Sequence, residues 1–335
     1  MIKVNQDDYA YATGRIRARE IKLLDKSRFD RMLEAPNAEE AYKILAEAEY
    51  GMGNDNTKSV YAFDSLLADE MKKTYALLSE IAPDKEVVKA FKKRYDFFNV
   101  KVLLKAELSN QETPPILVET GSFAVSEIVR IIRERDYDRL EPIMKEAVLE
   151  VYDVFSRTRD PQAIDLILDK ALYNQFYYDL KSINNEFIGE LADIIVDTTN
   201  IKMYVRARAL NRSLAFVRSI LLDGGKIDKA LYFNNHDKLV NDFINDLVKT
   251  ELGAEVIKGL KLNESGNIQA IEKALDDYLM KYMHRAKLVT IGIEPFIAFL
   301  FAKETEIKNV RIILTGKINQ LPNDVIRERL RLIYV

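Results

Sequence analysis

Apolar residues recur along most of this chain at the three- to four-residue spacing of amphipathic helices. Between 85 and 105, for example, apolar side chains at 88, 91, 95, 98 and 102 line one helical face. Alternating strand patterns are nearly absent, so we predict an all-α protein with more than about 60% helix, roughly twice the usual share. The expected helices lie near 9–24, 29–33, 37–50, 59–81, 85–106, 122–135, 138–155, 162–180, 184–210, 236–250, 268–285 and 296–313, with a short one after 322.

One pattern of polar and apolar residues occurs three times, at 96–106, 197–207 and 306–316. Each copy has an acid, two residues, Asn, a β-branched residue, a cation, three mostly apolar residues, a polar residue and a small one. The copies lie 101 residues (99 to 200) and 109 residues (200 to 309) apart, far more than the repeat of a helical solenoid. Each copy therefore indicates one small helical unit. We place the units at 1–112, 113–212 and 213–335, with the first edge near Pro114 and Pro115, which cannot continue a helix.

The polar residues of the repeat have a definite geometry on a helix. Asp96, Asn99 and Leu103 share one face, whereas Lys101 and Lys105 lie on another. Asn has a low helix propensity, because its side-chain amide competes with the backbone for hydrogen bonds. One interpretation is that each Asn bonds neighbouring backbone and fixes the packing of its unit. The structural repeat residues are Asp96, Asn99, Asp197, Asn200, Glu306 and Asn309.

A second interpretation concerns the cations, which would project onto a surface shared with a partner. Equivalent cations of three similar units would lie at equal distances from a common axis and form a ring. Alternatively, each cation pairs with an acid of its own unit, such as Asp96, Asp197 or Glu306, because weak exposed ion pairs are common. The candidate partner-binding residues are Arg15, Arg19, Lys101, Lys202, Arg206 and Arg311. The small residue that ends each copy would let another helix approach closely.

Composition narrows the classes of function. Fifty Lys and Arg against 53 Asp and Glu leave a net charge of −3, so no strong overall field attracts nucleic acid or acidic lipid, although local patches remain open. The chain has no cysteine, which removes disulfides and thiolate chemistry. Its first residues are charged, and no apolar run reaches the length that spans a bilayer. We therefore expect a soluble, cytoplasmic protein.

Catalytic motifs are scarce. His236 and His284 each stand alone in a charged helix, so we expect surface residues and no zinc site or histidine base. The segments 51–53 and 224–225 contain glycines but lack the Lys-Ser/Thr of a phosphate loop. We expect no catalytic residue, cofactor, metal or small-molecule substrate.

One weak resemblance to an enzyme remains. The stretch 241–249, with Asp276 and Asp277 downstream, imitates the paired metal-binding motifs of all-helical terpene synthases. Lys249 stands where that family has Glu, and a cation in a Mg²⁺ site opposes binding. An all-helical prenyl-type enzyme is therefore a remote alternative.

A closer resemblance covers essentially the whole length. It is carried by the three helical units, the opening Tyr-x-x-Gly-Arg-Ile-Arg-Ala-Arg-Glu at 11–20, and the segment 294–311, Glu-Pro-Phe-Ile-Ala-Phe-Leu-Phe-Ala-Lys-Glu-Thr-Glu-Ile-Lys-Asn-Val-Arg. With these features the chain resembles the C subunit of bacterial and archaeal V/A-type rotary ATPases, which corresponds to the d subunit of eukaryotic vacuolar enzymes. The segment 294–311 is the most specific part of the likeness.

The resemblance implies a fold, partners and a role. The fold would be a funnel of three similar helical domains about a pseudo-threefold axis, without an active site. The role would be that of a central-stalk rotor component, a socket between the shaft of the D and F subunits and the membrane proteolipid ring. ATP hydrolysis or synthesis would thereby be coupled to H⁺ or Na⁺ transport, with the protein held peripherally at the cytoplasmic side of the inner membrane. The main alternative is a helical protein-binding scaffold without a rotary role.

Overall fold

The structure is a computed structural model that describes residues 4–48, 50, 59–258 and 267–335. Helix accounts for 76% of the described residues, and these residues form no strand. The prediction of an all-α protein with more than about 60% helix is confirmed. The glycines at 51–53 lie outside the described residues.

The chain forms two compact units. The first is built from Asp84–Asp228, to which Val4 is also assigned, and the second combines Asn5–Pro83 with Lys229–Val335. The first two copies of the repeated motif lie in the first unit and the third copy lies in the second. The division into three repeat units at 1–112, 113–212 and 213–335 stays a prediction.

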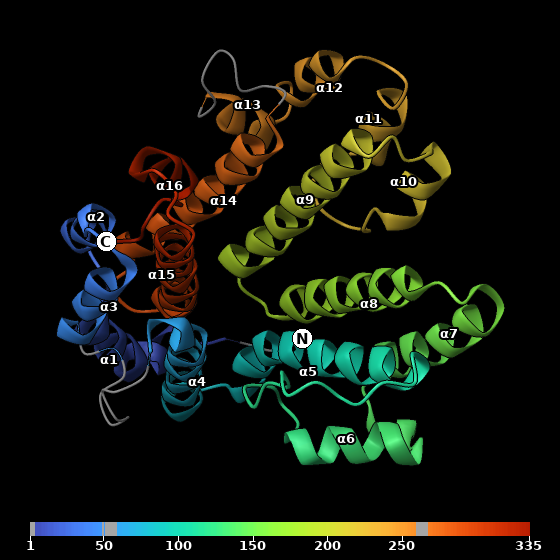
Figure 1. Cartoon of the computed structure of the whole chain (residues 1–335), viewed down its shortest axis with the longest axis horizontal. Coiled ribbons are helices and arrows are strands. Elements are labelled where there is room, and N and C mark those ends of the chain that lie inside the picture. The colour runs from blue at the N-terminus through green and yellow to red at the C-terminus, as the bar shows by residue number, and fades with distance from the viewer. Residues whose placement is uncertain (1–3, 49, 51–58, 259–266) are drawn as a thin grey trace. The chain divides into compact units, whose positions relative to one another are not determined.

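In the first unit, α5 and α8 lie side by side, α6 packs on α5, and α7 and α9 pack on α8 (Figure 1). Helices α5 to α8 share a core that includes Phe97 and Leu104 from α5, Ile131 from α6 and Val148 from α7. The helices are α5 (Lys85–Leu108), α6 (Val125–Glu134), α7 (Pro142–Thr158), α8 (Pro161–Ser182), α9 (Glu186–Ala209) and α10 (Leu214–Ile220), with a 3-10 turn η3 (Tyr137–Arg139).

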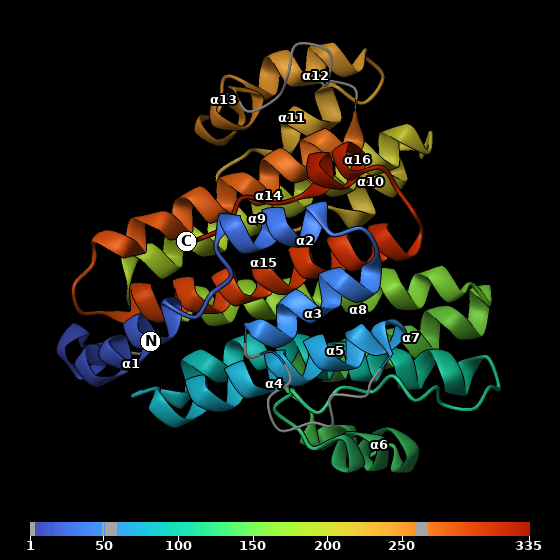
Figure 2. The same cartoon turned by 60° about the vertical axis from the view of Figure 1, so that its left-hand side comes forward.

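The second unit is built around α15, a helix of 26 residues against which α1, α2, α3, α4 and α14 pack (Figure 2). Pro295 lies in its first turn, where a missing amide does no harm, and the predicted buried helix over 296–313 is confirmed. The helices are α1 (Ala10–Glu20), α2 (Lys26–Glu34), α3 (Ala38–Glu47), α4 (Phe63–Ile81), α11 (Lys229–Asn234), α12 (Val240–Leu247), α13 (Glu251–Lys258), α14 (Ile268–His284), α15 (Ile293–Ile318) and α16 (Asn323–Arg329), with 3-10 turns η1 (Gln6–Tyr9), η2 (Val60–Ala62) and η4 (Arg285–Leu288).

Helix starts follow local chemistry. The Asn37 side chain accepts from the Glu40 amide at 2.8 Å and caps α3 at the start of the helix expected near 37–50. Asp160 caps α8 in the same way, and Pro161 occupies the first position of that helix. Helix boundaries in this chain are therefore largely set by residues within one turn.

Candidate functional site

Each repeated Asn binds one residue of the chain segment that follows its helix. In α5, Asn99 Nδ2 donates to the Val118 carbonyl at 2.8 Å and its Oδ1 accepts from the Val118 amide at 2.8 Å. In α9, Asn200 makes the same two bonds with Leu222, at 3.2 and 2.8 Å. A side-chain amide offers one donor and one acceptor side by side and so matches a peptide group. This pairing, which we call the Asn clamp, accounts for an Asn inside each helix.

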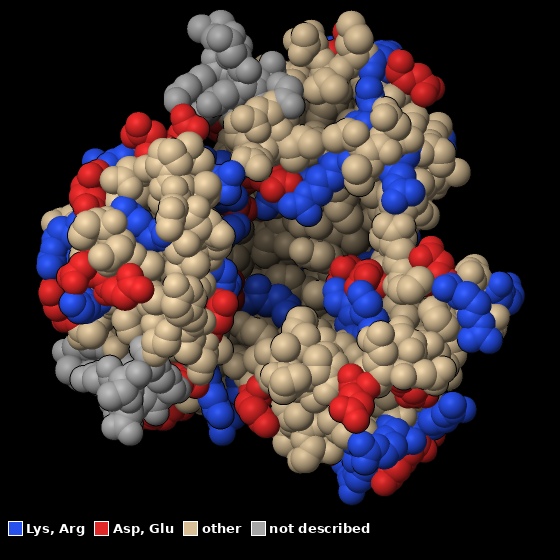
Figure 3. Space-filling model, in the orientation of Figure 1, with Lys and Arg blue, Asp and Glu red and all other residues tan. Residues whose placement is uncertain are grey.

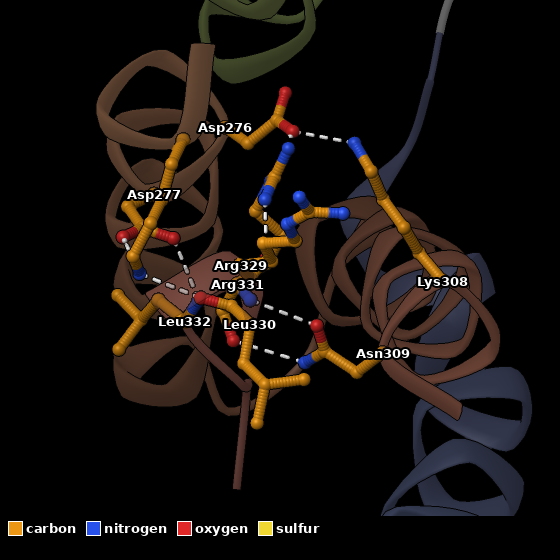
Figure 4. A network of polar contacts seen from close by, with 9 residues as sticks. Asp276, Asp277, Lys308, Asn309, Arg329, Leu330, Arg331 and Leu332 are labelled. Carbon is orange, nitrogen blue, oxygen red and sulfur yellow. Dashed lines mark hydrogen bonds and ion pairs between the residues drawn. The ribbon is translucent and has the colours of Figure 1, made fainter. Parts of the chain in front are cut away.

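The third Asn clamp lies in α15. Asn309 donates to the Arg331 carbonyl at 2.9 Å and accepts from the Arg331 amide at 2.8 Å (Figure 4). The same returning segment is bound by α14: the Leu332 amide donates to Asp277 at 2.6 Å, and Arg331 Nε donates to Asp276 at 2.7 Å. The C-terminal segment is therefore held between α14 and α15.

The acids of the first two copies receive backbone amides from the same returning segments. Asp96 accepts from the amides of residues 122 and 123 at 2.9 and 3.1 Å, and Asp197 accepts from those of 226 and 227 at 2.9 and 3.1 Å. Burial raises the pKa of both carboxyls, and the amide bonds oppose part of that rise. Each carboxylate thus fixes a second point of its returning segment.

A glycine beside each of these carboxylates makes the approach sterically feasible. A Cβ on Gly121 would lie 2.1 Å from Asp96 Oδ1, and one on Gly225 would lie 2.2 Å from Asp197 Oδ1. Gly225 also has a φ of +79°, which favours glycine. Sequence reasoning missed this role, although the glycines that follow the first two copies, at 121 and at 224–225, were an available signal.

The third acid is bound differently. Glu306 accepts from Lys303 Nζ at 2.7 Å, from the Tyr50 hydroxyl and from the Leu24 amide. Lys303 also lies 3.1 Å from Glu70. Burial, with Glu306 alongside, raises the pKa of the Tyr50 hydroxyl well above its usual value. In this copy the acid ties α15 to the N-terminal part of the chain.

All three repeated helices end in the same left-handed turn. Asn110, Asn211 and Gln320 have φ values of 50°, 50° and 54° and follow the motif Asn at the same spacing (99 to 110, 200 to 211, 309 to 320). The amide of the next residue donates to the carbonyl of the small motif residue, at 2.8, 2.9 and 2.9 Å, as in a Schellman cap. At Gly316 the close approach of another helix is visible, since a Cβ there would lie 2.6 Å from Ile326 of α16.

The motif cations meet acids, but not those of the motif itself. Lys101 Nζ lies 2.6 Å from Asp169 on α8, and Arg311 Nε lies 3.0 Å from Asp64 on α4. Lys202 is half-buried on α9, and Arg206 is exposed on the same helix. Lys101 and Arg311 therefore each have an acidic partner from another helix of their compact unit.

The remaining candidate cations lie on α1. Arg15 Nη1 lies 2.6 Å from the Tyr11 hydroxyl and 3.7 Å from Glu80. Arg19 is exposed and lines a pocket of about 350 Å³. Other charged residues lining this pocket are Lys22, Glu70, Lys73 and Lys303. On the face shown in Figure 3, cations and acids are interspersed.

Both histidines are half-buried, so the expectation that they lie at the surface is wrong. His284 packs against the Tyr334 ring at 5.5 Å, and its Nε2 lies 3.1 Å from the Ile333 carbonyl. The C-terminal segment covers His284, and this burial lowers its pKa. Within the described ranges, no three His, Asp or Glu side chains gather in a way that could hold a metal ion.

The acids of the weak terpene-synthase resemblance are occupied by cations. Asp276 contacts Lys308 and Arg331 (Figure 4), and Asp277 lies 3.0 Å from Lys273. A Mg²⁺ site needs carboxylates that are open to the ion. This arrangement disfavours the prenyl-type enzyme. Separately, none of the described helices combines the length and apolarity needed to cross a bilayer.

Comparison with known proteins agrees with the resemblance seen in the sequence. Residues 12–329 match the family described as ATP synthase (C/AC39) subunit. The chain is 27% identical over 325 residues to the C subunit of the V-type sodium ATPase of Enterococcus hirae, with 95% of this chain and 97% of that protein covered. It is 28% identical over 354 residues to the C subunit of the A-type ATP synthase of Methanocaldococcus jannaschii, with 96% and 86% covered.

These relatives are accessory components of their complexes rather than catalytic ones. The family predicted from the repeated motif and the segments 11–20 and 294–311 is confirmed. Since the match extends over nearly the whole length, this chain belongs to the ATP synthase (C/AC39) subunit family.

Proposed function

We propose that this chain is a non-catalytic rotor component in the central stalk of a V/A-type ATPase or ATP synthase. It joins the shaft of the D and F subunits to the membrane proteolipid ring and so couples ATP hydrolysis or synthesis to H⁺ or Na⁺ transport. In this role its three helical units surround a pseudo-threefold axis as a funnel, at the cytoplasmic face of the inner membrane. The observation that carries the proposal is the family match over 12–329, with relatives named as C subunits of V-type and A-type enzymes.

The geometry of the repeated helices supports a mechanical role. A part that transmits torque must keep its shape under load. Each repeated helix is joined to its returning segment by an Asn clamp and ends in a left-handed turn. The bonds of the Asn200 clamp are fully buried and resist local opening most strongly, because a broken bond there leaves groups that water cannot reach.

We assign the partner-facing role to the cations of the repeat and of α1. The acids that pair with Lys101 and Arg311 have exposed side chains, 49% for Asp169 and 66% for Asp64. Such pairs contribute little to stability, so a carboxylate of a partner can replace the internal acid at low cost. The assigned residues are Arg15, Arg19, Lys101, Lys202, Arg206 and Arg311.

Co-expression with the two shaft proteins tests the proposal. The wild-type chain should form a stable complex with them that weakens as salt rises. The triple variant Lys101→Glu, Lys202→Glu, Arg311→Glu should keep its helicity and melting temperature but lose the complex. A matched control, Lys145→Glu, Arg157→Glu, Lys249→Glu, changes the same charge at paired surface positions away from the motif and should assemble normally.

Two outcomes would count against the proposal. If the wild-type chain binds neither the shaft proteins nor a proteolipid ring, the scaffold without a rotary role is favoured. If the triple variant forms the complex, and that complex pumps ions like the one with the wild-type chain, the repeat cations have only a structural role.

A further inference from the structure

The turn between α14 and α15 is fastened to α1, and the two form one surface. Arg17 Nη2 donates to the Ala286 carbonyl at 2.9 Å and to the Val289 carbonyl at 2.8 Å. These bonds hold η4 against α1 at one end of the second unit, where Figure 2 shows the connection between α14 and α15 beside α1. We call the surface of residues 11–22 and 285–291 the α1–η4 face.

Large apolar side chains are exposed on this face. Ile21 is 83% exposed and Leu288 is 89% exposed, and Tyr11 and Ile291 are 64% and 43% exposed. Single exposed apolar residues are ordinary on a protein surface. Here four lie on two segments that are hydrogen-bonded to each other, and groups of exposed apolar side chains mark contact surfaces. These side chains would be buried only when something docks on the face.

The same face carries a strong excess of positive charge. Its two segments contain six cations and one acid, Glu20, whereas the whole chain has a net charge of −3. Glu20 pairs with Arg17 at 2.8 Å, and outside the segments Glu80 lies 3.7 Å from Arg15. The charge of the face therefore fits an anionic partner. The cations are Arg15, Arg17, Arg19, Lys22, Arg285 and Lys287.

We propose that the α1–η4 face contacts the anionic headgroups of the membrane surface. Ile21 and Leu288 insert at the boundary between headgroups and acyl chains, and the surrounding cations pair with lipid phosphates. Exposed Leu, Ile and Tyr beside Lys and Arg are the side chains that bind a bilayer interface. The inference rests on the proposed function, which places this chain beside the membrane, and it makes lipid rather than a protein carboxylate the partner of Arg15 and Arg19.

A bilayer fits this face better than one anionic site on a protein. The cations are spread over a helix and a separate turn, and most of them are exposed. A leaflet presents many phosphates in any geometry, so it can pair with dispersed cations without a preformed pocket. Two basic residues, Arg19 and Lys287, lie on the two different segments, and each should strengthen binding about fivefold.

Co-sedimentation of the isolated full-length chain with vesicles tests the inference. The wild type should bind vesicles of phosphatidylcholine mixed with an equal part of phosphatidylglycerol, and not phosphatidylcholine alone, with binding that weakens as salt rises. Arg19→Gln with Lys287→Gln should weaken binding about thirtyfold. Ile21→Ser with Leu288→Ser should also weaken it and leave the circular dichroism spectrum unchanged.

Matched controls use exposed residues elsewhere. Lys145→Gln with Lys249→Gln removes the same charge, and Leu210→Ser with Leu239→Ser removes two exposed apolar side chains, 67% and 76% exposed. Both controls should bind vesicles like the wild type. Equal loss in the controls would show that binding follows total charge or hydrophobicity, and the proposal would be overturned.

The lipid contact and the proposed function can fail separately. If the wild type ignores anionic vesicles but Ile21→Ser with Leu288→Ser abolishes assembly with the proteolipid ring, the face docks a protein and the lipid proposal is overturned. If vesicles bind as expected but no shaft or ring protein associates, the lipid contact stands and the rotary function does not.

Discussion

The substitution Asn200→Ala should reveal what the Asn clamp contributes to this fold. In the native chain Asn200 and Leu222 are each 1% exposed, and both of their hydrogen bonds are buried. Removing the side-chain amide leaves the Leu222 N–H and C=O without partners. Water cannot replace those partners unless the returning segment moves away from α9.

The expected loss of stability follows from the two Leu222 backbone groups that are left without a hydrogen-bond partner. A buried polar group without a partner costs about 1–3 kcal/mol, so Asn200→Ala should lower the free energy of unfolding by about 2–6 kcal/mol. The other two clamps give an internal comparison, because Val118 and Arg331 are half-buried and open to water. In Asn99→Ala and Asn309→Ala water can take the place of the lost partner. Only the net contribution of two hydrogen bonds to the free energy of unfolding is then lost, about 1–3 kcal/mol.

The assay combines urea unfolding with amide hydrogen exchange. Because two compact units need not unfold together, a global transition alone does not localise the effect. In Asn200→Ala the Leu222 amide should exchange at least about thirtyfold faster, which corresponds to a loss of about 2 kcal/mol. The Arg331 amide, bound by a different clamp, should exchange as in the wild type.

Either of two results would refute the reasoning. The first is that Asn200→Ala costs no more than Asn99→Ala or Asn309→Ala, and the second is that the Leu222 amide keeps its protection. Burial of the clamp would then not determine its contribution to stability.

Three further predictions concern the second unit. Lys303→Met should cost about 3–5 kcal/mol because it leaves Glu306 buried without its cation, and Lys303→Met with Glu306→Gln should recover part of that loss in urea unfolding, because Gln carries no charge and keeps an acceptor for the Leu24 amide. Burial holds the pKa of His284 below its usual value, so on acidification the unfolded chain takes up a proton that the folded chain does not. The free energy of unfolding should therefore fall as pH drops below about 6.5. Urea titrations across this pH range should show a smaller fall in His284→Phe than in the wild type. Gln320→Gly should raise the melting temperature through a gain of about 0.5 kcal/mol, because φ is 54° there, whereas Gln320→Val should lower it.

The sequence by itself determined most of the helices and the buried face of the repeat, although α11 and α13 were not among the expected elements. Asn37 and Pro161 mark helix starts through contacts within one turn, and the 3.6-residue period places Asp96 and Asn99 on one side. These features are predictable because each depends on neighbours close in sequence.

Only the tertiary structure decided which groups meet across the chain. Lys101 pairs with Asp169, 68 residues away, and Arg311 pairs with Asp64, 247 residues away. Charged residues of both signs occur along the whole chain, so composition does not indicate which pair will form. Which acid pairs with which cation depends on how the helices pack against one another in the folded chain.

The third copy of the repeat shows most clearly that the sequence pattern does not predict contacts between distant segments. Its acid, Glu306, matches Asp96 and Asp197 in sequence, yet it binds the Leu24 amide, 282 residues away, rather than the segment that follows its own helix. The burial of His284 under the C-terminal segment has a similar origin. Contacts between distant segments leave no local pattern, because they arise only when segments far apart in the chain fold into one unit.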